Sequence, residues 1–562
     1  MTTPALRWPR RRGIRAAVAA WAAPWWREAV PFAALTGMAA VVRAVGLGDK
    51  PMHHDEAQHA WFAWRILEGQ GYAYDPVFHG PVQFYSTTLA HLLIGVGEAS
   101  ARAAPLLMGT IAVFLPFFLR RQLGTAGALT ASALLCLTPS YLYFSRFARE
   151  DIYFACITLA VIVVLLRFLD EARRWHPTAL LGLAALSFAT KETTYISVFV
   201  AGLFMLAVGV AELVHSRRGG PPLRETRVVG GVLSLGGAAW AWGASAFLIV
   251  YTLLFSSFLT NPAGLKEGLW GIIDYWLSQQ VVGRGGQPWF YYLVLIATYE
   301  WATLLLGLVG IVAVARRPTL HGAFLVWYLV GTLAIFSWAS ERMPWLVLHP
   351  LLPLVLLAGI GAQALWAARG RLPAQIALGA AAVAVAASVW FAFGAAFERQ
   401  ADPRELLVQV QSSDDVPRIQ DEVVELQRAA SRTAGKPVVL QVDSWGGTGW
   451  PWSWYLRDVP VGYYDMSVPE EVPLGPIVLV ADPNHEAMRP RLGDYVGKRF
   501  RLRVWWVPEY GAAGPRGWFR WVTRREAWNA TATMDEWLYV RRDLARRLTR
   551  SAAARGAGTA AP

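Results

Sequence analysis

The sequence has little charge and little cysteine for its length. Charged residues make up 16% of the 562 positions and hydrophobic residues 55%, which argues against an ordinary soluble enzyme. Lysine is also scarce, because five of the 52 basic residues are lysine and all the others are arginine. Cys136 and Cys156 both lie in apolar runs, so we expect no disulfide framework and interpret them as small core residues.

Aromatic residues are abundant instead, with 28 Trp, 25 Phe and 19 Tyr, and this composition rules out a disordered chain. The net charge is +13, but the arginines are scattered between apolar segments and are not gathered on one domain. Nucleic acid is therefore not an expected partner. Together with a mean hydropathy of +0.34, these features predict an integral membrane protein in contact with membrane lipid.

Apolar segments long enough to cross a bilayer recur through the first 400 positions. A hydrocarbon core needs about 20 apolar residues per helix. Eleven spans are predicted, at 30–47, 84–119, 124–143, 152–169, 178–190, 194–213, 229–257, 290–315, 320–338, 344–367 and 373–397. The second is too long for one helix and is expected to include a helix at the membrane surface. Residues 1–29 are then a cytoplasmic and interfacial segment, and residues 30–399 the transmembrane domain.

Arginine clusters occur in every second loop between these spans, at Arg10 to Arg12, Arg120/Arg121, Arg173/Arg174, Arg217/Arg218, Arg316/Arg317 and Arg369/Arg371. The positive-inside rule places these loops and the N-terminus in the cytoplasm. An odd number of spans then places the C-terminal part on the extracytoplasmic side. Every unusual polar cluster of the membrane half lies in the loops of that side, at 48–83, 144–151, 191–193, 258–289 and 339–343.

The composition changes near residue 400. Short β-rich runs at 437–442, 476–481 and 500–507 predict strands, and the apolar spacing in 417–430 predicts a helix. Residues 400–540 are therefore expected to form an extracytoplasmic α/β domain, followed by a disordered tail at 541–562. The four tryptophans at 445, 450, 452 and 454 either stack on a bound glycan or pack against the domain core and the membrane interface.

The first outer loop opens with His53-His54-Asp55-Glu56-Ala57-Gln58-His59. Asp55 is predicted to be the N-cap of a helix, with His59 one turn further on. Three interpretations stay open: Asp55, beside Glu56, is a general base; Asp55 and His59 bind a divalent metal; or Asp55 only caps the helix. His54 is a further candidate. His79, before the Gly80-Pro81 turn, either contacts a ligand or marks a tight return into the membrane.

The other outer loops also carry paired charges. Arg149 can hold a phosphate through two hydrogen bonds while Asp151 orients an acceptor or a metal, or these residues and Glu150 pair among themselves. Lys191 and Glu192 are either functional or an internal ion pair. Further candidates are Arg284 in a flexible glycine-rich loop, Glu341, Arg342 and His349.

Taken together, a carboxylate pair and three separate cations, Arg149, Lys191 and Arg342, lie at one predicted membrane surface. This combination suggests a lipid-linked phosphate as the substrate. A Walker motif and a Rossmann fingerprint are absent from these loops.

Several strings resemble those of the GT-C membrane glycosyltransferases, and the branch resembled most is that of the protein O-mannosyltransferases and the lipid A aminoarabinose transferase (glycosyltransferase family 39-like). The resemblance rests on Asp55-Glu56, on Arg149-Glu150-Asp151 and on the many spans. The strings at 54–60, 78–81, 341–345 and 452–458 are similar to a subfamily labelled "flippase-activity-associated protein".

The resemblance implies a polyprenyl-phosphate-linked sugar donor and an acceptor, whether glycan, lipid or protein, bound from outside. Asp55 matches the catalytic acidic position and Asp151 a second one, and Arg149 looks like a donor-phosphate ligand. Lys191, Arg342 and His349 match residues of this family only by their position after a predicted span. Metal use varies in this superfamily, so no cofactor is assigned; the candidate metal ligands are Asp55, His59 and Asp151.

Two functions follow. The first is an inverting sugar transfer with Asp55 as the base and with Arg149 and its companions on the departing phosphate. The alternative is a non-catalytic protein that binds lipid-linked sugar or assists a flippase.

Overall fold

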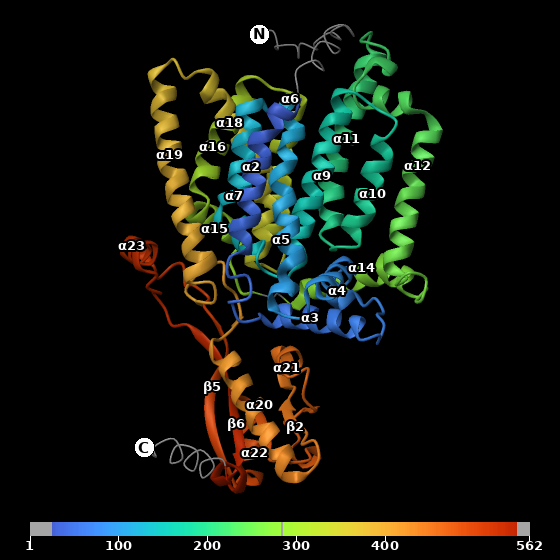
Figure 1. Ribbon diagram of the computed structural model, residues 1–562. Coiled ribbons are helices and arrows are strands. Elements are labelled where there is room, and N and C mark those ends of the chain that lie inside the picture. Colours follow the sequence, from blue (N-terminus) through green and yellow to red (C-terminus); the bar gives the residue numbers. More distant parts are fainter. Residues whose placement is uncertain (1–24, 283–284, 548–562) are drawn as a thin grey trace.

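The protein consists of a helical bundle and a separate sheet domain below it (Figure 1). The computed structural model describes residues 25–282 and 285–547, so the predicted interfacial stretch at the N-terminus and most of the predicted tail lie outside it. The apolar helices of the bundle are α2 (Trp25–Ala44), α5 (Glu98–Phe114), α7 (Thr125–Leu137), α9 (Glu150–Asp170), α10 (His176–Phe188), α11 (Thr194–Arg217), α12 (Val229–Phe255), α15 (Tyr291–Tyr299), α16 (Trp301–Arg316), α17 (Leu320–Trp338), α18 (Leu348–Ala367) and α19 (Leu372–Phe393).

Helices cover all eleven predicted spans, but length and composition support fewer crossings. In the described chain, seven helices are long and apolar enough to cross a membrane, and the pair α15 and α16, bent by 107° at Glu300, makes an eighth if it counts as one span. The remaining predicted spans are covered by α2, α7 and α10, of which α7 and α10 are shorter apolar helices. The protein has a membrane-protein fold, and its number of spans stays a prediction.

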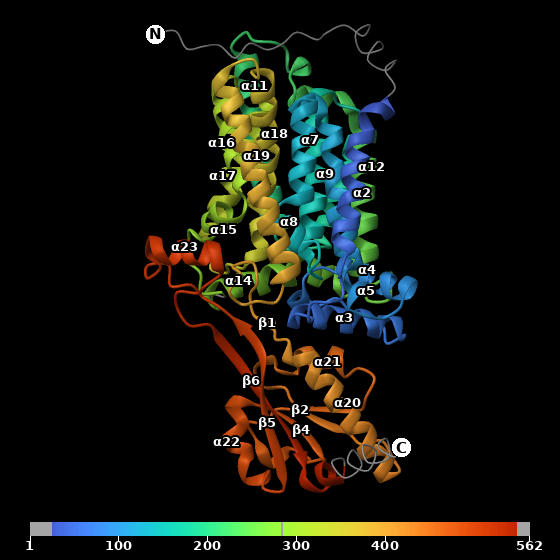
Figure 2. The same ribbon diagram turned by 60° about the vertical axis from the view of Figure 1, so that its left-hand side comes forward.

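The long second span, predicted at 84–119, is two helices. Helix α4 (Val82–Ile94) ends at Gly95, whose φ of 86° favours glycine, and α5 then runs up into the bundle. Figures 1 and 2 show α4 lying across the lower end of the bundle beside α3 (His54–Leu67). The expectation that this segment is more than one helix is confirmed, and the place of α4 at the membrane surface stays a prediction.

Helix α18 runs through the centre of the bundle, and 94% of its most apolar window is buried. It packs closely on α16 because glycines face each other there. A Cβ on Gly310 would lie 1.9 Å from the carbonyl oxygen of Leu357, and one on Gly361 would lie 2.1 Å from that of Leu306. Small residues allow such close approach between membrane helices.

The lower domain is a six-stranded mixed sheet in the order β1-β5-β6-β4-β2-β3. Its strands are β1 (Gln411–Ser412), β2 (Leu440–Asp443), β3 (Val461–Tyr464), β4 (Ile477–Ala481), β5 (Tyr495–Trp505) and β6 (Ala532–Arg541). The three predicted strands correspond to β2, β4 and β5, and the predicted helix to α20 (Asp415–Ala434). Residues 542–547, which were predicted to be disordered, are helical, and Leu544 packs into the core of this domain.

The sheet domain is fastened to α3 by α21 (Gly449–Tyr455), which carries much of the tryptophan cluster. Trp452 and Trp454 are fully buried in a core that also contains Ala57 and Ala60 of α3. The hydroxyl of Tyr455 accepts a hydrogen bond from the backbone N–H of Met52 (2.8 Å). These two tryptophans therefore pack between the domains, and their faces are closed to a glycan.

Candidate active site

A cavity of about 370 Å³ lies where the bundle, α3 and the start of the sheet domain meet. Its walls come from the N-termini of α3 and α9, the loop before α4, helix α14 (Ile272–Val282), the loop after α17 and the linker into β1. It is lined by His53, His54, Asp55, Gln58, His59, Val77, Phe78, His79, Arg149, Tyr275, Trp276, Glu341, Met343, Trp345, Gln409 and Val410.

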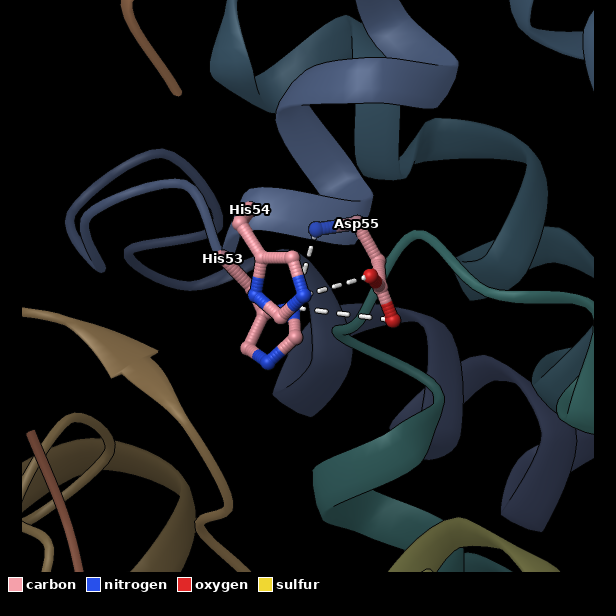
Figure 3. Close-up of side chains that lie close together, drawn as sticks. All are labelled: His53, His54 and Asp55. Carbon is pink, nitrogen blue, oxygen red and sulfur yellow. Dashed lines mark hydrogen bonds and ion pairs between the residues drawn. The ribbon is translucent and has the colours of Figure 1, made fainter. Parts of the chain in front are cut away.

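Asp55 lies in the first turn of α3 and lines the cavity (Figure 3). The prediction that Asp55 caps this helix is wrong, because the cap is His53. Its Nδ1 accepts a hydrogen bond from the N–H of Asp55 (3.1 Å), and the Glu56 carboxylate accepts one from the N–H of His53 (3.0 Å). This reciprocal cap occupies two N–H groups at the start of the helix. The Asp55 carboxylate, 19% exposed, is left for the cavity.

Among the described residues, His53, His54 and Asp55 bring three potential metal ligands within 4.8 Å of one another. Both nitrogens of His53 are occupied, however, because Nδ1 accepts from Asp55 and Nε2 donates to the carbonyl of Gln409 (2.8 Å). Two ligands remain, which is too few for a structural or catalytic site of the usual kind. A zinc site with three protein ligands therefore does not fit without breaking the cap, and the predicted metal ligands His59 and Asp151 have other partners.

His54 supports the orientation of Asp55. Its Nε2 lies 2.9 Å from Oδ1 of Asp55. Burial, together with nearby Arg503 and Arg149, holds the pKa of His54 well below its usual range, so the ring is neutral at physiological pH. A neutral ring placed in this way donates one N–H to the carboxylate and adds no charge to the cavity.

Arg149 is the cation at the centre of the cavity. Its guanidinium forms an ion pair with Asp55, and its Nε lies 3.7 Å from the Asp151 carboxylate. The group lies 4.1 Å from the centre of the Trp345 ring, a cation–π geometry, and its Nη2 is 3.2 Å from Nε2 of His79. Arg149 is thus held flat on an aromatic face between two carboxylates.

A second layer of buried charge lies behind Arg149, at the start of α9. Asp151 accepts a hydrogen bond from Nζ of Lys191 (2.7 Å), and Nε2 of His349 lies 3.5 Å from the same oxygen. Glu150 pairs with His59 at 2.9 Å. The two acidic residues also suit the positive end of the α9 dipole. Lys191 and Glu192 do not pair with each other, since each has a different partner.

His79 is a further cavity residue with a charged neighbour. Its Nδ1 lies 2.8 Å from Glu192, and its ring stacks on Trp276 at 5.0 Å. Burial disfavours the charged ring, but Glu192 and Glu150 outweigh burial and raise the pKa of His79. The next residue must be glycine, because a Cβ on Gly80 would lie 2.1 Å from the carbonyl oxygen of Ala189.

Glu56 does not line the cavity, contrary to its expected catalytic role. Its fully buried carboxylate accepts from Arg102 at 2.7 and 2.9 Å and from the N–H of Ala148 at 2.8 Å, and it pairs with Lys50 at 3.2 Å. Burial opposes its charge, but Arg102 and Lys50 hold the pKa of Glu56 well below the usual range. Glu56 is a positioning residue that fixes α3 against the loop before α9.

The loop after α17 contributes less than its sequence suggests. The Arg342 guanidinium donates to the carbonyls of Ser337 (2.8 and 3.1 Å) and Gln287 (2.9 Å), so it braces the loop and does not line the cavity. Glu341 does line the cavity. Arg284 lies outside the described residues.

Several lining residues were not predicted from the sequence. Trp345 lies within the string at 341–345, so its place beside Arg149 had a sequence signal. Tyr275 and Trp276 of α14, and Gln409 and Val410 of the linker into β1, had no such signal. Gln409 and Val410 lie far from the other lining residues in the sequence, and the tertiary structure brings them to the cavity.

The sequence is similar to known sugar transferases. Residues 78–218 match the family described as dolichyl-phosphate-mannose-protein mannosyltransferase. The chain is 26% identical over 330 residues to undecaprenyl phosphate-alpha-4-amino-4-deoxy-L-arabinose arabinosyl transferase 1 of Pseudomonas fluorescens, a match that covers 54% of each protein. The chain thus matches about half the length of that relative.

The fold is similar to those of two solved proteins. ArnT from Cupriavidus metallidurans bound to undecaprenyl phosphate superposes with a TM-score of 0.53 at 15% identity, over 92% of this chain and 98% of that one. The Archaeoglobus fulgidus oligosaccharyltransferase tethered to an acceptor peptide gives 0.50 at 12%, over 79% and 64%. The chain therefore shares the GT-C fold of these proteins, and its sequence similarity to sugar transferases is limited to the segments given above.

Proposed function

We propose that the protein transfers a sugar from a polyprenyl-phosphate donor to an acceptor on the extracytoplasmic side of the membrane. The observation that carries this proposal is the pairing of Asp55 with Arg149 inside one cavity at an end of the bundle. A proton acceptor and a phosphate-binding cation are the two groups that such a transfer needs. The names of the similar proteins, which include undecaprenyl phosphate, support the class of donor.

In this reaction the acceptor oxygen or nitrogen forms a bond to the anomeric carbon while the bond from that carbon to the phosphate oxygen breaks. Asp55 takes the proton of the acceptor. The electron pair of the broken bond stays on the departing polyprenyl phosphate, which gains negative charge. Arg149 can bind two of its oxygens at once. His79, whose pKa Glu192 and Glu150 raise, can add a further positive charge once the phosphate draws Arg149 away from its Nε2.

The ion pair between Asp55 and Arg149 suggests an order of substrate binding. While Arg149 holds the Asp55 carboxylate, that carboxylate is a poor proton acceptor, because a neighbouring cation favours its charged form. An arriving phosphate competes for Arg149 and releases Asp55. We therefore expect the donor to bind before the acceptor reacts.

The test is turnover of purified protein with polyprenyl-phosphate sugars, followed by mass spectrometry of the lipid products. Asp55→Asn keeps the shape of the side chain and removes the proton acceptor, so the rate should fall by about 10²–10⁴-fold. Donor affinity should be kept or should rise, because the donor phosphate no longer competes with a carboxylate for Arg149. Asp75→Asn is the matched control, because Asp75 is exposed in the same loop, caps a 3-10 turn and does not line the cavity.

A full rate for Asp55→Asn would refute Asp55 as the base. Wild-type protein that binds the donor and releases no product with any acceptor class would favour the non-catalytic alternative.

A further inference from the structure

Helix α23 (Gly514–Arg524) follows β5 in the chain but does not pack on the sheet. In both views it lies beside the lower ends of α15 and α19 (Figures 1 and 2). Trp521 is fully buried there, with its ring 6.0 Å from that of Tyr299 and its Nε1 donating to the carbonyl of Arg404 (2.8 Å). One helix of the C-terminal domain therefore packs against the helical bundle.

A buried network fixes α23 at this height. Arg525, the residue that ends the helix, donates from Nε to Glu405 (2.7 Å). Glu405 also accepts from the hydroxyl of Tyr299 (2.6 Å) and from Nε of Arg399 (2.6 Å). Charged groups that are buried with several partners are costly to separate. The helix is therefore held firmly against the bundle.

The opposite face of α23 is exposed and strongly basic. Phe519 is 69% exposed, and the side chains of Arg520 and Arg524 are 60% and 72% exposed. Arg516 lies on the same face, which therefore carries three cations; the nearby anion Glu526 is 4.0 Å from Arg520 and 3.7 Å from Arg524. Cations and an aromatic ring on one exposed face match the two parts of a membrane interface, the anionic headgroups and the acyl boundary.

The surface of the bundle next to α23 carries several exposed tryptophans. Trp301 packs on Phe391 at 5.3 Å, directly beside the Arg525 network, and remains 38% exposed. Trp390 is 59% exposed in the last turns of α19, and Trp289, just before α15, is 64% exposed. Exposed tryptophans at the ends of apolar helices mark the level of the lipid headgroups.

We propose that the exposed face of α23 lies in the headgroup layer of the bilayer and binds the phosphates of anionic phospholipids, with Phe519 inserted among the upper acyl chains. The charge of the face fits this partner, since each arginine near an anionic surface adds about 1 kcal/mol of attraction. The helix then ties the sheet domain, and with it the linker residues that line the cavity, to the membrane surface.

The test uses full-length protein in nanodiscs of phosphatidylcholine and phosphatidylglycerol. A spin label is attached at Phe519→Cys in a background without Cys136 and Cys156, and its accessibility to oxygen is compared with that to a water-soluble nickel chelate. Leu248→Cys on the exposed face of α12 is the lipid control, and Val468→Cys in the sheet domain is the water control. We expect oxygen to dominate at 519, as at 248, and nickel to dominate at 468.

Replacing Arg516, Arg520 and Arg524 together by glutamate should shift the label at 519 towards nickel accessibility, and so should nanodiscs of phosphatidylcholine alone. Nickel accessibility at 519 equal to that at 468 in the anionic nanodiscs would overturn the proposal. Dipolar broadening between labels on two chains would also overturn it, because it would assign this face to a second copy of the protein.

Discussion

The Arg149 side chain has several partners inside the cavity. It contacts Asp55, approaches Asp151 and lies over Trp345, and these contacts hold its guanidinium in one orientation inside the cavity. A planar donor fixed in this way suits two phosphate oxygens, whereas lysine supplies a point charge without the fork. The same contacts also fit a purely structural ion pair, and the two roles differ in what a substitution changes.

We expect Arg149→Ala to weaken binding of a polyprenyl-phosphate sugar by roughly 10- to 100-fold, the range given by about 1.5–3 kcal/mol for hydrogen bonds to a charged group. Arg149→Lys should weaken it less, and binding of free sugar should not change. Arg342→Lys is the control, because Arg342 braces the loop after α17 and its own side chain does not line the cavity. Lower thermal stability with unchanged donor affinity would assign Arg149 to structure.

If His79 contributes charge to the donor site, we expect donor binding to depend on pH. Burial acts against the charged ring, but Glu192 and Glu150 raise the pKa of His79 above its usual value of about 6.5. The positive charge is therefore fully present below about pH 6.5 and is lost as the pH rises through the raised value. Donor affinity should fall over the same interval.

Glu192→Gln removes the main group that raises the pKa of His79, so that only Glu150 still opposes the effect of burial. The fall in donor affinity should then move to lower pH, as measured by titrating donor binding between about pH 5 and 9. Glu171→Gln, with its exposed side chain in the loop between α9 and α10, is the control and should leave the profile unchanged. A profile that does not move in Glu192→Gln would show that His79 does not control it.

At the scale of elements, the contact between α16 and α18 depends on glycine. The two helices approach so closely that a Cβ on Gly310 has no space beside the carbonyl oxygen of Leu357. Gly379 of α19 has no heavy atom within 4 Å of the same position. Gly310 therefore faces a packed neighbouring helix, whereas Gly379 faces open space.

We expect Gly310→Ala to destabilise the protein by about 1–3 kcal/mol, the usual cost of overpacking, and to lower the unfolding temperature of the detergent-solubilised protein. Gly379→Ala should be neutral or stabilise by up to about 1 kcal/mol, because alanine favours the helix. Equal unfolding temperatures for the two variants would contradict the close packing of α16 and α18.

For the whole molecule, the cavity, the sheet domain and α23 all lie at one end of the bundle. Helix α6 (Arg120–Leu123), which carries one arginine pair, lies at the opposite end (Figure 1). This arrangement agrees with the alternation of arginine clusters in the loops, which predicts that the cavity end is extracytoplasmic.

Single cysteines in a background without Cys136 and Cys156 test this orientation. Val77→Cys, 46% exposed at the cavity, should react with an impermeant thiol reagent in intact cells. Arg173→Cys, in the loop between α9 and α10, should react only after the membrane is permeabilised. Labelling of position 173 in intact cells would reverse the predicted topology.

Local patterns in the sequence were enough to predict the helical segments, the change to an α/β domain near residue 400 and several residues of the cavity. The length of an apolar segment and the spacing of arginines depend on neighbouring positions, so they can be read from the sequence without the fold. Asp55, His79 and Arg149 were recognised because ionisable residues at the ends of membrane segments are rare.

The choice of partners was decided by the tertiary structure. Glu56 is adjacent to Asp55 in the sequence, yet it pairs with Arg102, 46 positions away, and is removed from the cavity. Gln409 and Val410 enter the cavity because α21 fixes the sheet domain on α3. A charged side chain takes its role from the ion that the fold brings within about 4 Å, and no periodicity in the sequence records that distance.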